Sequence, residues 1–146
     1  QVSSSDYATV LLRPDNFTPP SRTPWGGSKI VSQYKKEALQ SCSSNADWDV
    51  VGESWELSVG PEFPSFTDNG VALARVLAAN PREMLGEEAA IGAETTALLV
   101  KWLDAKDNLS LQIHPSDDHA GLRADETGKS ECWYVVEHEP GCGLYL

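Results

Sequence analysis

The second half of the chain alternates short apolar runs with turn residues, and this spacing limits its possible folds more than any other feature. Residues 97–105 (ALLVKWLDA), 109–114 (LSLQIH) and 131–138 (ECWYVVEH) each have the length and composition of a strand. The Asp107-Asn108 turn and Pro115 stand between these runs, and Pro140-Gly141 follows the last of them. Consecutive strands joined by turns favour antiparallel β structure, so we expect a mainly β fold.

The first half predicts a less regular structure. Residues 1–24 are rich in Ser, Thr and Pro, which indicates an extended arm, and residues 53–58 have the pattern of a short strand. A small helical segment is expected at about residues 71–90. Within it, Asn80 and Glu83 have the spacing of a capping box at the start of a second helix.

One predicted strand carries a polar face. Ser110, Gln112 and His114 alternate with apolar residues, so their side chains share one face of the strand. A face made of a hydroxyl, an amide and an imidazole is unusual in a core and suits a wet pocket. The alternation by itself is also typical of an ordinary half-exposed strand.

The next strand begins with a carboxylate. If the strands lie side by side, Gln112, His114 and Glu131 can converge on one metal ion. Nitrogen and oxygen ligands of this kind suit zinc, but also iron, manganese or nickel. From the spacing alone, a hydrogen-bonded histidine on a surface strand remains the simpler interpretation.

Charge and composition exclude several classes of function. The 146 residues carry a formal charge of -11, which disfavours binding to nucleic acid or to an anionic membrane surface. No apolar run reaches the roughly 18 residues of a membrane span. The three cysteines are sparse and lack CxxC spacing, so we interpret them as reduced thiols of a cytoplasmic protein, although Cys132 and Cys142 could pair.

Five segments, in order, resemble type I mannose-6-phosphate isomerases. The two most specific are residues 101–115 (KWLDAKDNLSLQIHP) and 128–134 (GKSECWY). The Trp-Gly-Gly turn at 25–27, GESWELS at 52–58 and VALARVLAANPREMLG at 71–86 precede them. The resemblance covers nearly the whole chain after about residue 22.

The resemblance implies a cupin fold, an antiparallel jelly roll or double-stranded β-helix, with a small helical insertion. Residues 25–146 would form the N-terminal part of the catalytic domain, behind the arm at 1–24. The rest of the barrel, a histidine that serves as the fourth metal ligand and a substrate-binding arginine would follow Leu146. We therefore expect this segment alone to be an incomplete isomerase that associates with the remaining part; a structural fragment that pairs with another chain is a further alternative.

The resemblance also implies roles for particular residues. Gln112, His114 and Glu131 would bind one zinc ion per site, whereas His119 and His138 do not occupy the place of the fourth ligand. The implied reaction interconverts mannose 6-phosphate and fructose 6-phosphate by moving a proton between C2 and C1. Zinc would polarise the sugar carbonyl beside the acidified C–H bond.

Lys101, Ser110 and Lys129 match polar residues that line the family's pocket, and the two lysines would give an acidic protein local positive charge for a phosphosugar. The general base is open between Lys129, a metal-bound water and a residue beyond Leu146, so Lys129 is the catalytic candidate within the chain. The alternative function is a non-catalytic or regulatory sugar-phosphate-binding cupin.

Overall fold

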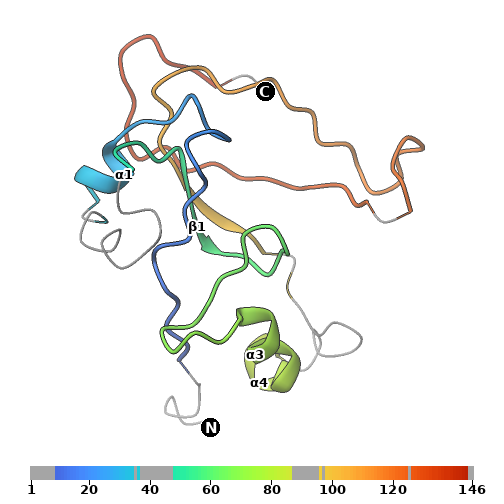
Figure 1. Ribbon diagram of the computed structural model, residues 1–146. Coiled ribbons are helices and arrows are strands. Elements are labelled where there is room, and N and C mark those ends of the chain that lie inside the picture. The colour runs from blue at the N-terminus through green and yellow to red at the C-terminus, as the bar shows by residue number, and fades with distance from the viewer. Residues whose placement is uncertain are drawn as a thin grey trace, which may run out of the picture. The chain divides into compact units, whose positions relative to one another are not determined.

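The computed structural model describes residues 9–34, 36, 48–86, 96, 98–124 and 126–144. The chain folds as two units, residues 1–109 and residues 110–146 (Figure 1). The helices and strands of the described residues all belong to the first unit: α1 Lys29–Ser32, β1 Glu53–Leu57, α3 Leu73–Ala79, α4 Pro81–Leu85 and β2 Val100–Leu103. In this described part, no helix has the length and apolarity needed to cross a bilayer.

Strands β1 and β2 form a two-stranded antiparallel sheet, which agrees with the strands expected at 53–58 and 97–105. Trp55 faces Lys101, but the next pair joins Leu57 to Val100, so one extra residue interrupts the register. Such a bulge bends the strand and increases its twist. The described chain thus contains a small sheet and few helices.

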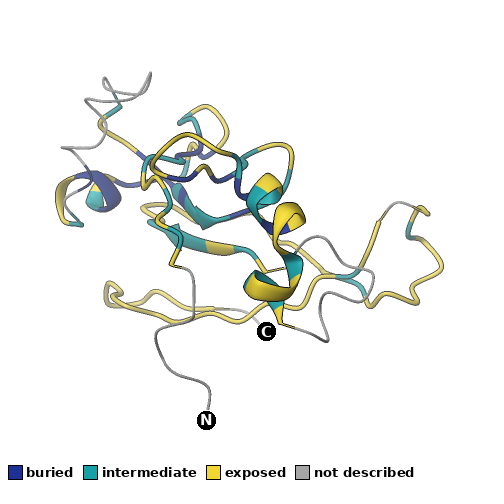
Figure 2. Cartoon of the chain, turned by 90° about the horizontal axis from the view of Figure 1, so that it is seen from below, coloured by how far each residue is buried: buried dark blue, intermediate teal, exposed yellow. Residues whose placement is uncertain are grey.

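The apolar core of the first unit gathers residues that are far apart in sequence. Phe17, Ile30, Val31 and Val51 are buried together. Figure 2 shows the buried residues in dark blue. Phe17 comes from the expected arm, where it forms an isolated bridge with Ser54 of β1. Residues 9–24 contain no helix, as expected, but they pack into the unit. The division into arm and domain therefore remains a prediction.

A close backbone crossing joins the Trp-Gly-Gly turn to the segment before β1. A Cβ atom on Gly26 would lie 2.6 Å from the Cα of Gly52, so neither position has room for a side chain. The amide of Val51 donates to the carbonyl of Gly27, and the amide of Gly27 donates to the carbonyl of Asp104. These bonds fix the start of β1 beside the end of β2.

Helices α3 and α4 lie within the segment expected to be helical, and residues 87–90 of that segment lie outside the described residues. Pro81 occupies the first turn of α4, and Glu83 follows in that turn. The expected capping box is wrong, because the Asn80 side chain makes no capping hydrogen bond. Asn80 also ends α3, where its amide donates to the carbonyls of Val76 and Leu77. The backbone of Asn80 (φ -138°, ψ 55°) therefore caps the end of α3, while its side chain does not cap the start of α4.

The strands expected at 109–114 and 131–138 are wrong for this structure. Neither segment has strand pairing among the described residues, and the backbone hydrogen bonds of the second unit close local turns instead. Leu111 is 86% exposed and Ile113 is 85% exposed. Alternation specifies which side chains share a face, but a strand also needs a neighbour for its backbone groups.

The turn expected at Pro140-Gly141 is confirmed. The amide of Cys142 donates to the carbonyl of Glu139 across it, at 3.2 Å. Gly141 has φ +87°, which glycine adopts without a steric penalty. Proline followed by a glycine with positive φ is the pattern of a type II turn.

Candidate metal centre

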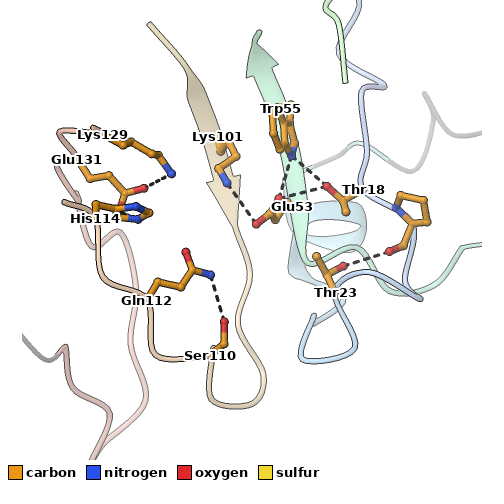
Figure 3. A network of polar contacts seen from close by, with 11 residues as sticks. Thr18, Thr23, Glu53, Trp55, Lys101, Ser110, Gln112, His114, Lys129 and Glu131 are labelled. Carbon is orange, nitrogen blue, oxygen red and sulfur yellow. Dashed lines mark hydrogen bonds and ion pairs between the residues drawn. The ribbon is translucent and has the colours of Figure 1, made fainter. Parts of the chain in front are cut away.

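Three of the predicted site residues meet in the second unit. The Nε2 atom of His114 lies 3.4 Å from Oε2 of Glu131, and Nζ of Lys129 lies 2.5 Å from Oε1 of the same carboxylate. Figure 3 shows the Glu131 carboxylate between the imidazole and the ammonium group. One carboxylate therefore connects two residues that are 15 positions apart.

A closed loop brings these residues together. The amide of Gly128 donates to Oδ1 of Asp117 at 2.7 Å. A Cβ atom at Gly128 would lie 2.5 Å from the carbonyl oxygen of Pro115, so only glycine lets the two backbones approach this closely. This close approach of Gly128 to Pro115 and Asp117, which we call the neck of the loop, lies directly after His114 and just before Lys129.

The charge around Glu131 favours its ionised form. The hydrogen bond from Lys129 is the main cause that lowers the pKa of Glu131 below its ordinary value, and the charge of Lys129 and that of a protonated His114 act in the same direction. Burial opposes them. A metal requires an ionised carboxylate, so this environment keeps Glu131 in the state that can act as a ligand.

The gap between His114 and Glu131 suits a shared metal ion. Zinc binds imidazole nitrogen at about 2.0–2.1 Å and carboxylate oxygen at about 2.0–2.2 Å, in tetrahedral geometry. Two such ligand atoms are then about 3.4 Å apart, given the same bond lengths. The observed separation of Nε2 and Oε2 is 3.4 Å. The donor pair therefore fits zinc in both atom type and spacing.

Gln112 and Ser110 form a second contact in this unit. The amide nitrogen of Gln112 donates to Oγ of Ser110 at 3.1 Å, as their shared face predicted (Figure 3). This bond uses the nitrogen and leaves the amide oxygen, the atom that could bind a metal. Among the described residues, no three His, Cys, Asp or Glu side chains lie close enough together to hold a metal ion. The inclusion of Gln112 in a common site stays a prediction.

Lys101 lies in the first unit and has its own partners. Its Nζ atom is 3.3 Å from Oε1 of Glu53 and 4.8 Å from the centre of the Trp55 ring. The other oxygen of Glu53 accepts from Trp55 Nε1 at 2.9 Å and from Thr18 Oγ1 at 3.3 Å. Glu53 and Thr18 carry no sequence pattern that marks them as members of this network. Trp55 pairs with Lys101 across the sheet, and Glu53 lies two positions before Trp55, on the same face of β1. The strand register therefore identifies Glu53 as a neighbour of Lys101.

Comparisons with known proteins agree with the resemblance inferred above. The catalytic domain of the type I phosphomannose isomerases matches residues 20–144, and the chain belongs to this family. The mannose-6-phosphate isomerase of Streptococcus mutans is 35% identical over 123 residues, which cover 82% of this chain and 35% of that protein. No solved structure matches the chain.

Two Bacillus subtilis proteins are similar to a comparable extent. The putative mannose-6-phosphate isomerase YvyI is 30% identical, over 77% of this chain and 34% of its own length. The probable mannose-6-phosphate isomerase GmuF is 32% identical, over 84% of this chain and 36% of its own length. The chain thus spans about a third of the length of the curated relatives it matches.

Proposed function

We propose that the protein containing this chain is a zinc-dependent isomerase that interconverts mannose 6-phosphate and fructose 6-phosphate. Family membership and the printed names of the relatives support this reaction. The observation that carries the metal part of the proposal is the 3.4 Å separation between His114 Nε2 and Glu131 Oε2. Those two atoms have the types and spacing of neighbouring zinc ligands.

The proposed zinc ligands in this chain are Gln112, His114 and Glu131. When bound, zinc supplies Lewis-acid polarisation of the sugar carbonyl. Glu131 is ionised and hydrogen-bonded, so it is ready to bind a cation without first losing a proton. Gln112 is neutral, so the site keeps more positive charge than one built from three carboxylates.

The remaining candidates would bind the phosphosugar. Ser110 offers a hydroxyl next to Gln112, and Lys129 offers ammonium protons beside Glu131. Lys101 would add positive charge, although Glu53 already balances its charge in this structure. Lys129 is the residue of this chain considered for moving the proton between C2 and C1.

The proposal includes a cupin jelly roll and a cytoplasmic location. A small antiparallel sheet with few helices is compatible with the first part of such a barrel. Cys132 and Cys142 are free and exposed, which suits a reducing compartment.

A coupled assay on the full-length protein tests the proposed function. We expect turnover of mannose 6-phosphate that disappears after treatment with a chelator and returns when zinc is added. Stoichiometric zinc binding without turnover of any aldose phosphate would instead favour the alternative, a regulatory cupin. Full turnover in chelated protein would contradict the zinc assignment.

A further inference from the structure

The two oxygens of the Glu131 carboxylate face different partners. Oε1 contacts Lys129 at 2.5 Å, and Oε2 faces His114 at 3.4 Å (Figure 3). A carboxylate can bind a metal through one oxygen or through both. Trp133 also hydrogen-bonds to this carboxylate, and with Lys129 on Oε1 the oxygen that faces the imidazole is the one directed toward a shared metal ion.

The contact between Lys129 and Glu131 arises from local chain geometry. The two residues are two positions apart in an extended segment, so their side chains lie on the same side. The neck formed by Gly128 and Asp117 fixes the start of this segment. The contact between the lysine and the carboxylate therefore depends on residues that are close together in sequence.

We propose that Lys129 is a positioning residue, which holds Oε1 of Glu131 so that Oε2 alone binds the metal beside His114. This inference rests on the proposed zinc function and assigns Lys129 a role that acts through Glu131. A ligating carboxylate is commonly oriented by a hydrogen bond to its other oxygen, and loss of such a partner weakens metal binding.

An opposing effect must be considered, because the ammonium group also repels a cation. Glu131 already balances the charge of Lys129, and the two side chains are 30% and 42% exposed. Water therefore screens the repulsion, while the hydrogen bond to Oε1 continues to orient the carboxylate. We expect the orienting effect to outweigh the repulsion, so removal of the ammonium group should weaken zinc binding. Tighter zinc binding would show that the repulsion is the larger effect.

The test measures the dissociation constant for zinc ion in the full-length protein, by competition with a chromophoric chelator. Lys129→Met keeps the length of the side chain and removes the ammonium group. We expect about 10- to 100-fold weaker zinc binding in this variant. Lys129→Arg keeps a cationic donor and should restore the affinity to within about 3-fold of the wild type.

Lys106→Met is the matched control, because Lys106 is exposed in the first unit and the substitution changes the net charge equally. We expect it to leave zinc affinity unchanged. Unchanged or tighter zinc binding in Lys129→Met, with normal binding by the wild type, overturns the positioning role and leaves the proposed function intact. A wild type that binds no zinc removes both. Far-UV circular dichroism identifies a variant that fails to fold, and Lys129→Arg then decides: affinity weakened beyond 3-fold overturns the inference.

Discussion

Two lysine–glutamate pairs, one in each unit, show how the same chemistry serves different purposes. Lys101 and Glu53 meet across the sheet, with both side chains largely buried. Lys129 and Glu131 are neighbours along the chain and remain partly in water. Both Glu53 oxygens are used by protein donors, whereas one Glu131 oxygen faces an imidazole. The two carboxylates therefore differ in the partner of their second oxygen, which is a hydroxyl and an indole at Glu53 and an imidazole at Glu131.

The largest expected effect is on zinc affinity, which should depend on the second unit and not on the first. His114→Ala removes a proposed ligand, so we expect zinc affinity and turnover to fall by at least about 100-fold, beyond the loss from an orienting partner. Glu53→Gln should leave zinc affinity within about 3-fold, because its oxygens serve other donors. Equilibrium zinc titration and the coupled assay measure both.

His119→Ala is the control for this comparison, since His119 is an exposed histidine in the same unit. It should retain zinc and activity. Full activity with stoichiometric zinc in His114→Ala would show that the imidazole is not a ligand.

The second prediction concerns the coupling within the first pair. A double-mutant cycle with Glu53→Gln and Lys101→Met should give a coupling free energy of about 1–2 kcal/mol, because the pair is shielded from water. Urea unfolding of the four proteins measures it. A value near zero would mean that the network around Trp55 does not depend on the ion pair.

The third prediction concerns the hydroxyl that supports Glu53. Thr18 is 3% exposed, and its Oγ1 donates to Glu53 and accepts from Trp55 Nε1 at 3.0 Å. Thr18→Val should lower the free energy of unfolding by about 1 kcal/mol, because these bonds are lost in a buried site. Thr18→Ser keeps the hydroxyl and should retain the hydrogen-bonded part of this stability. Equal losses in both variants would assign the effect to packing.

The smallest effect is expected for the exposed pair. A cycle with Lys129→Met and Glu131→Gln should give a coupling of less than about 0.5 kcal/mol in unfolding, decreasing further in high salt. The measurement uses chelated full-length protein, so that metal binding does not contribute. A coupling as large as that of Lys101 with Glu53 would remove the contrast between the units.

Local patterns in the sequence predicted the parts of the site that depend on neighbouring residues. The shared face of Ser110 and Gln112 follows from the alternation of an extended chain. The strands at 53–58 and 97–105 were also recognised from composition. The segment at 109–114 has an equally clear pattern, but strand pairing depends on a distant neighbour that alternation does not specify.

Buried polar contacts between distant segments escaped the sequence analysis for the same reason. Lys36 is 8% exposed, and its ammonium donates to the carbonyl of Pro14 at 3.2 Å, to Oγ of Ser54 at 2.8 Å and to the carboxylate of Glu56. A lysine in a polar stretch indicates a solvated surface. Only the folded arrangement of three segments provides enough oxygen atoms to bury it.

The crossing of Gly26 and Gly52 has a consequence for how the chain tolerates changes in length. The intervening segment begins and ends at the same point, where the Val51 amide is bonded to the Gly27 carbonyl. The entropy of closing such a loop grows only logarithmically, by about 0.6 kcal/mol for each doubling of its length. Lengthening this loop away from the buried Ile30, Val31 and Lys36 should therefore add little to the free energy of closing it, so we expect the start of β1 to stay in place.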